Sequence, residues 1–143
     1  MAPSVSHSCA LRTDRSLWCW GSNGAIGVEL GREATLPTRV GSESDWTQLD
    51  TGMDHSCAIR ADGSLWCWGG NEWGQLGLGD TARRTLPTRV GGEMRWLAVA
   101  AGLSSTCGIR VDGSLWCWGD NRVGQLGLGD EMARLTPTLV VFP

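Results

Sequence analysis

The stretch that decides the fold is "CAIRADGSLWCWG", residues 57–69. Two close copies exist, "CALRTDRSLWCWG" at 9–21 and "CGIRVDGSLWCWG" at 107–119. A β-prone run, an Asp-Gly turn and a second apolar run are strong signals of a β-hairpin. The second run, residues 65–68, is apolar on both faces, which indicates a strand covered on both sides. We therefore predict packed hairpins with a structural core of Trp18, Trp20, Trp66, Trp68, Trp116 and Trp118.

The hairpins recur with a period near 50 residues. Cys9 and Cys57 are 48 positions apart, and Cys57 and Cys107 are 50 apart. Glycine-rich stretches and Pro-Thr segments follow each hairpin, and such a period with many turn signals is typical of β-propeller blades. We predict an all-β single repeat array over residues 1–143, with units at approximately 1–45, 46–95 and 96–143.

Composition and motifs argue against several classes of function. The net charge is −3, and no basic cluster of the kind that binds nucleic acid is present. No apolar run reaches the roughly 18–20 residues of a membrane span. The glycine-rich loops lack the Lys-Ser/Thr of a phosphate site, and no catalytic motif or dense acidic calcium loop occurs. Because His7 and His55 repeat with the hairpins, we interpret them as structural. We expect a non-enzyme with no cofactor and no metal.

The cysteines form three pairs ten residues apart, and the hairpin register decides their chemistry. A three-residue loop, 61–63, places Cys57 opposite Cys67, whereas a two-residue loop places Cys57 opposite Trp68 and prevents a bridge. Reduced core cysteines and a metal site are the alternatives to disulfides. If the cysteines are paired, we expect an oxidising location, extracellular or periplasmic, for a secreted protein. The candidate disulfides are Cys9–Cys19, Cys57–Cys67 and Cys107–Cys117.

The motif "W-x-W-G-x-N-x-x-G-Q-L-G", preceded by "C-A-[LI]-R-x-D-G", resembles the repeat of regulator-of-chromosome-condensation (RCC1-like) propellers, in the cysteine-containing type found in bacteria. The resemblance implies four-stranded blades, usually seven, that act by binding proteins. Relatives include a guanine-nucleotide exchange factor and secreted β-lactamase inhibitors. Neither activity is carried over, because the exchange residues have no counterpart here and the inhibitor's contacts cannot be aligned.

About three units are too few for a closed propeller, which needs roughly 4–8 blades. Apolar faces at the two ends would then seek cover. Three outcomes are open: a homo-oligomer, such as two copies in a six-bladed ring; a fragment of a larger propeller, held by a partner or marginally stable; and an open arc.

Positions that break the repeat are the candidate binding residues. Glu72 and Trp73 correspond to Arg122 and Val123, and the pair Arg83-Arg84 corresponds to Ala133-Arg134. Loops on a rigid scaffold commonly carry binding, and Trp and Arg are enriched in interfaces. We predict an interaction module that presents propeller loops to a protein partner. The alternatives are a self-assembling structural unit and carbohydrate binding through an exposed Trp; Trp73 packed under its own loop is the structural interpretation. The candidate site comprises Trp73, Glu72, Arg122, Arg83 and Arg84.

Overall fold

The structure is a computed structural model that describes residues 1–22, 24–93 and 95–143. These residues form twelve strands: β1 (Ala2–Pro3), β2 (His7–Leu11), β3 (Leu17–Gly21), β4 (Ala34–Arg39), β5 (Trp46–Thr51), β6 (His55–Arg60), β7 (Leu65–Gly69), β8 (Arg84–Arg89), β9 (Trp96–Ala101), β10 (Ser105–Arg110), β11 (Leu115–Gly119) and β12 (Arg134–Leu139). In the described part of the chain, no helix is long and apolar enough to cross a membrane.

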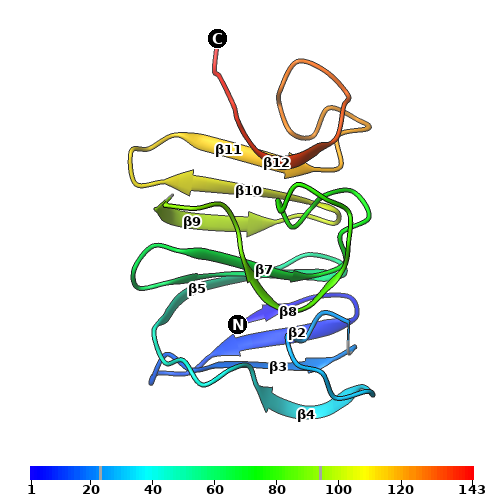
Figure 1. Cartoon of the computed structure of the whole chain (residues 1–143), viewed down its shortest axis with the longest axis vertical. Coiled ribbons are helices and arrows are strands. Elements are labelled where there is room, and N and C mark those ends of the chain that lie inside the picture. The colour runs from blue at the N-terminus through cyan, green and yellow to red at the C-terminus, as the bar shows by residue number, and fades with distance from the viewer. Residues whose placement is uncertain (23, 94) are drawn as a thin grey trace.

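The described strands make three antiparallel four-stranded sheets that lie on one another as layers (Figure 1). The sheets follow chain order: β1-β2-β3-β4, β5-β6-β7-β8 and β9-β10-β11-β12. The first strand of the second sheet, β5, contacts the first strands of the other two sheets, β1 and β9. This arrangement is that of consecutive propeller blades and confirms the predicted all-β fold, as a partial propeller. Sequence reasoning missed β1, because this two-residue strand lacks the tryptophan that begins β5 and β9.

The central hairpin of each sheet has the register of a three-residue loop. Cys57 is paired with Cys67, and the amide of Arg60 donates to the carbonyl of Ser64 over 3.0 Å. Gly63 has a φ of 82°, which closes the turn. In the first sheet Arg15 takes this position with a φ of 60°. Among the described residues it is the one non-glycine residue with a positive φ.

All six cysteines lie in described segments and form three disulfides, one in each hairpin. Hydrogen-bonded and non-hydrogen-bonded residue pairs alternate along an antiparallel ladder. Because Arg60 and Ser64 are a hydrogen-bonded pair, Cys57 and Cys67 form a non-hydrogen-bonded pair, in which side chains approach most closely. Their Cα atoms are 4.2 Å apart. The register that separates the cysteines is thereby excluded.

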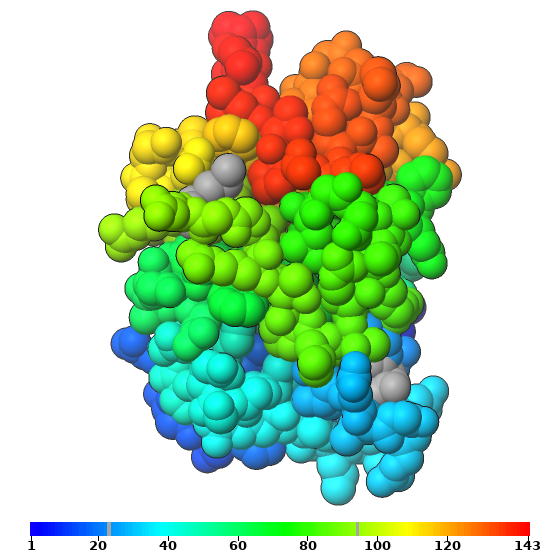
Figure 2. Space-filling model, viewed as in Figure 1, coloured from blue at the N-terminus to red at the C-terminus, as the bar shows by residue number. Residues whose placement is uncertain are grey.

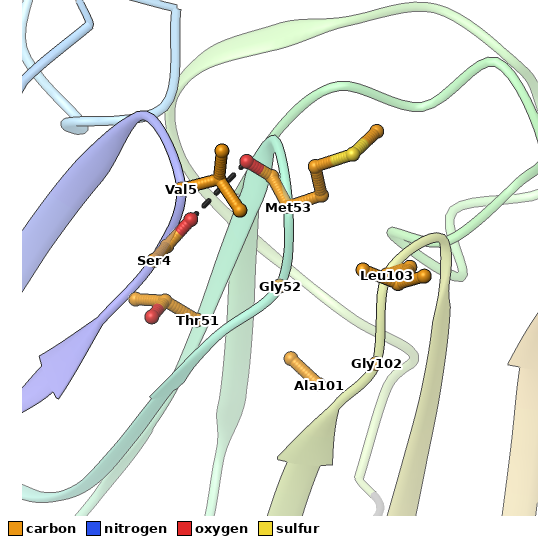
Figure 3. A pocket seen from close by; sticks show the side chains of 8 residues that line it. All are labelled: Ser4, Val5, Thr51, Gly52, Met53, Ala101, Gly102 and Leu103. Carbon is orange, nitrogen blue, oxygen red and sulfur yellow. Dashed lines mark hydrogen bonds between the residues drawn. The ribbon is translucent and has the colours of Figure 1, made fainter.

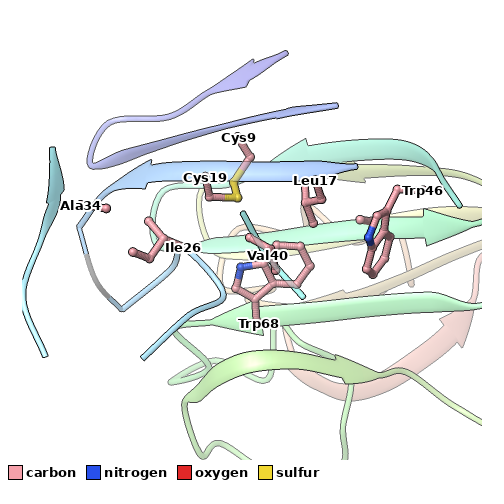
Figure 4. Packing of buried hydrophobic residues seen from close by; sticks show 9 residues of the cluster. Cys9, Leu17, Cys19, Ile26, Ala34, Val40, Trp46 and Trp68 are labelled. Carbon is pink, nitrogen blue, oxygen red and sulfur yellow. A yellow bond between two sulfur atoms is a disulfide. The ribbon is translucent and has the colours of Figure 1, made fainter. Parts of the chain in front are cut away.

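The core lies between the sheets, because each sheet has two unlike apolar faces. Alternation along a strand puts Trp66 and Trp68 on one side of the second sheet, which we call the tryptophan face. Leu65 and Cys67 lie on the opposite side, the leucine face. The tryptophan face packs on the leucine face of the preceding sheet. Figure 4 shows this junction, where Trp68 lies against a cluster that includes Cys9, Leu17, Cys19, Ile26 and Val40.

The six tryptophans predicted for the core differ in their burial. Trp68 and Trp118 are fully buried, but the other four members are half-buried. The first tryptophan of each pair lies near the hairpin turn, where its indole donates to a serine hydroxyl, as Trp66 does to Ser64 over 2.9 Å. An arginine covers its ring, with Arg60 5.8 Å from Trp66. Trp20 is half-buried because it lies on the tryptophan face of the first sheet, against which no other described sheet packs.

Candidate functional site

Two sets of loops emerge at one end of the sheets, which we call the loop face. Because neighbouring strands alternate in direction, the short β5–β6 connection (52–54) and the glycine-rich β7–β8 connection (70–83) leave the same end. Their counterparts in the third sheet, 102–104 and 120–133, do the same. The hairpin turns lie at the opposite end, which we call the turn face. The long loops are on the right in Figure 1.

Buried asparagines hold the glycine-rich loops in shape. The Asn71 amide donates to the carbonyls of Asp80 and Ala82, each over 3.0 Å, and its oxygen accepts from the amide of Leu76. Asn121 repeats this pattern with Asp130 and Leu126. The loops are therefore fixed scaffolds that can present side chains without an ordering cost on binding.

The structure brings two of the predicted site residues together. The Arg122 guanidinium lies 3.8 Å from the centre of the Trp73 ring, so the two loops join across neighbouring sheets. Arg122 also donates to both carboxylate oxygens of Asp120, over 2.9 and 3.0 Å, and this contact lowers the pKa of Asp120. Trp73 is half-buried and Glu72 is exposed on the same loop. Trp73 and Arg122 thus form one composite patch.

The two adjacent arginines, Arg83 and Arg84, have different surroundings. Arg83 forms an ion pair with Asp54 of the β5–β6 loop and keeps 43 % of its side chain exposed. Arg84 donates to Asp80 over 2.7 Å, and the third sheet repeats this pair as Arg134 and Asp130. We therefore assign Arg84 to the loop scaffold. Its hydrogen bond is the main reason that the pKa of Asp80 lies below its ordinary value.

Three exposed apolar residues on the loop face were missed by sequence reasoning. Val5, Met53 and Leu103 are 84 %, 46 % and 71 % exposed. They border a hollow of about 290 Å³ (Figure 3). The Met53 carbonyl accepts from Ser4, and the Met53 amide donates to the Leu103 carbonyl, so backbone contacts link the loops. Each residue stands four positions before a cysteine, and aligning the repeats on their cysteines would have found them.

His7 and His55 form hydrogen bonds between neighbouring sheets, and their surroundings support the interpretation that they are structural. His7 Nε2 lies 2.7 Å from the Ser56 hydroxyl, and His55 Nε2 lies 2.9 Å from that of Thr106. Ser56 donates its hydrogen to the Ala25 carbonyl, so the histidine must donate through Nε2–H. A Ser–His contact can serve catalysis, but Ser56 is 0 % exposed and its hydrogen is already engaged.

The titration of both histidines reflects this environment. Burial lowers the pKa of His7. Burial, together with the charge interaction with the nearby His7, lowers the pKa of His55 to about 4. The described residues include no cluster of three or more His, Cys, Asp or Glu that could hold a metal ion.

Comparison with known proteins connects this architecture to one repeat family. The profile of the regulator of chromosome condensation (RCC1) repeat matches residues 62–109 and 112–143. A second profile of the same repeat matches residues 4–25, 46–75 and 96–125. No curated protein sequence matches the chain.

Solved structures show the same fold. Human WBSCR16 is similar with 22 % identity and a TM-score of 0.85, over 99 % of this chain and 39 % of that protein. Yeast RCC1 (Prp20), in its complex with Kap60, has 24 % identity and a TM-score of 0.88, over 98 % and 36 %. Prp20p from Saccharomyces cerevisiae, described with its binding properties to Gsp1p and histones, has 26 % identity and a TM-score of 0.86, over 98 % and 37 %. The chain spans less than two fifths of the length of each.

Proposed function

Because this chain belongs to the regulator of chromosome condensation (RCC1) repeat family, we propose that it is a non-catalytic module that binds a protein partner through its loop face. Proteins of this repeat family are commonly binding modules, and the yeast relative is described with protein ligands. The specific partner of a relative is not carried over.

The single observation that carries the proposal is the exposed row of Val5, Met53 and Leu103. Exposed apolar side chains that gather in one place on a soluble protein mark interaction sites. Here they border a hollow, and hydrogen bonds between the loops hold their backbones. The Trp73–Arg122 patch on the same face adds two residue types that are enriched at binding hot spots.

Carbohydrate binding through Trp73 is less well supported. A sugar needs an open aromatic face, and the guanidinium of Arg122 covers one face of the Trp73 ring. No other observation favours a glycan at this position, so we retain the protein partner.

The three disulfides also bear on where the module works. Disulfides persist in oxidising compartments and are rare where thiols are kept reduced. We therefore propose an extracellular or periplasmic location, supported by the pairing of all six cysteines.

Matched variants on the loop face and on the turn face test the proposal. Immobilised protein would capture partners from the medium of its source organism, and calorimetry would then measure the Kd of each purified partner. We expect Leu103→Asp to weaken binding about tenfold or more, the equivalent of about 1.4 kcal/mol. The control is Val111→Asp, at a residue 58 % exposed on the turn face, which should bind like the wild type.

Two results would count against this function. One is a partner that tolerates Leu103→Asp but is lost with Val111→Asp, which would place binding on the turn face. The other is the absence of any protein whose retention differs between the two variants.

A further inference from the structure

The first and third sheets each leave one apolar face uncovered, and the two faces differ. The first sheet exposes its tryptophan face, where a hollow of about 400 Å³ is lined by Ala10, Arg12, Trp18, Trp20 and Pro37. The third sheet exposes its leucine face. Ile109 is 38 % exposed there, whereas the equivalent Ile59, under the third sheet, is 2 % exposed. In Figure 2 these sheets form the two ends of the molecule, blue to cyan and yellow to red.

The two junctions inside the chain show how such faces fit. The indole of Trp68 donates to the Ala25 carbonyl over 2.9 Å, and that of Trp118 donates to the Gln75 carbonyl over 2.9 Å. A hydroxyl beside each indole donates to the same carbonyl: Ser56 to Ala25 and Thr106 to Gln75.

A glycine forms the floor of each junction. A Cβ on Gly27 would lie 2.9 Å from Trp68 Nε1, and one on Gly77 would lie 2.7 Å from Trp118 Nε1. Each indole therefore occupies a socket that a glycine makes possible, with a backbone carbonyl as its acceptor.

The third sheet carries the same socket without an indole in it. Gly127 has a φ of 68°, like its counterparts, but a Cβ there would meet only Val140, at 3.7 Å. Gln125, whose carbonyl corresponds to those of Ala25 and Gln75, is exposed. At the other end of the chain, Trp20 and Ser8 occupy the positions of Trp68 and Ser56. One chain thus holds a socket without an indole and, on an uncovered face, the half-buried indole of Trp20 in the matching position.

We propose that the leucine face of the third sheet binds the tryptophan face of the first sheet of a second copy of this chain. Trp20 of one copy fills the socket at Gly127 of the other and donates to the Gln125 carbonyl, as does the Ser8 hydroxyl. The second copy is the occupant because the same pair of faces already packs together twice within the chain. In the third sheet Ser105 stands where the inner junctions have His7 and His55, so its hydroxyl faces Ser8 of the second copy.

Such an interface is heterologous, since each copy uses one face of each kind. It leads to a ring if the rotation closes and to an open assembly if it does not. The row of Val5, Met53 and Leu103 takes no part in it, so this inference can fail while the proposed partner binding holds.

Two charged variants and their mixture test this pairing. Trp20→Arg blocks the tryptophan face, and Ile109→Arg blocks the leucine face. Neither position is buried within a single chain, so circular dichroism should show folded protein for both. In sedimentation experiments we expect wild-type protein at a multiple of 15.3 kDa and each variant alone at 15.3 kDa. An equimolar mixture should double the mass, because each variant retains the face that the other needs.

Three results would overturn the inference. Wild-type protein that sediments as a monomer at every concentration shows that the faces do not pair. A mixture that stays monomeric shows that they are not complementary. A variant that still associates by itself shows that like faces pair, or that another surface is used.

Discussion

The buried His55 makes the free energy of unfolding depend on pH over a range above that in which the hydrogen-bonded carboxylates titrate. Its pKa falls from 6.5 to about 4 in the folded protein, mainly because burial disfavours the charged ring. Between these values the unfolded chain binds a proton that the folded chain does not. The contribution of His55 to the free energy of unfolding is therefore complete above pH 6.5 and is lost as the pH falls toward 4.

The size of the effect follows from the shift. Each unit of pKa difference corresponds to 1.36 kcal/mol, so lowering the pH from 7 to 4 should remove about 3 kcal/mol of unfolding free energy through this residue. Asp62, Asp112 and the similarly hydrogen-bonded carboxylates have a pKa lowered from 3.8, so their contribution is lost below that window.

Urea unfolding at pH 7, 6, 5 and 4 would measure this loss, and His55→Gln is the informative variant. Glutamine keeps an N–H that can donate to Thr106 but does not titrate in this range. We expect the variant to lose most of the slope, whereas His7→Gln should remove less, because Asp54 partly offsets the lowering of the His7 pKa. A His55 ring that titrates near pH 6.5 by NMR, or a slope that persists in His55→Gln, would refute the reasoning.

Three further predictions concern the hairpins and sockets. Arg15→Gly should raise stability by up to about 1 kcal/mol in urea unfolding, because it relieves a non-glycine residue at φ 60°; a clear loss would contradict this. Replacing Cys57 and Cys67 together with alanine should cost about 2–4 kcal/mol, and mass spectrometry of the unreduced wild type should find no free thiols; six free thiols would disprove the pairing. Gly77→Ala should cost about 1–3 kcal/mol more than Gly127→Ala at low protein concentration, because both have a positive φ but only Gly77 lies under an indole; equal losses would show that backbone strain alone matters.

The repeated hairpin was predictable from sequence because its determinants are local. The Asp-Gly turn, the alternation of the strands and the pairing of Cys57 with Cys67 all follow from a few adjacent residues. The half-burial of Trp66 was not foreseen. Trp66 and Trp68 lie on the same face of their strand, but Trp66 lies near the hairpin turn, and the alternation of a strand does not distinguish its burial from that of Trp68.

The candidate site was less accessible to sequence reasoning. The contact between Trp73 and Arg122 joins loops of different repeats, and no local pattern fixes their separation. The sequence indicates that Arg84 is available for binding, but its side chain forms an ion pair with Asp80. Val5, Met53 and Leu103 differ in residue type, so the repeat does not stand out there although the position is the same. The assignment to a bacterial subtype stays a prediction.

The glycine sockets have a consequence for how the chain could grow. Each unit brings its own indole and its own receiving surface, so any unit fits after any other without new side chains. Tandem duplication of residues 46–95 would therefore lengthen the protein by one layer and create one more junction of a kind already present. Gene duplication can build such arrays in single steps, because no compensating substitution must arise beforehand.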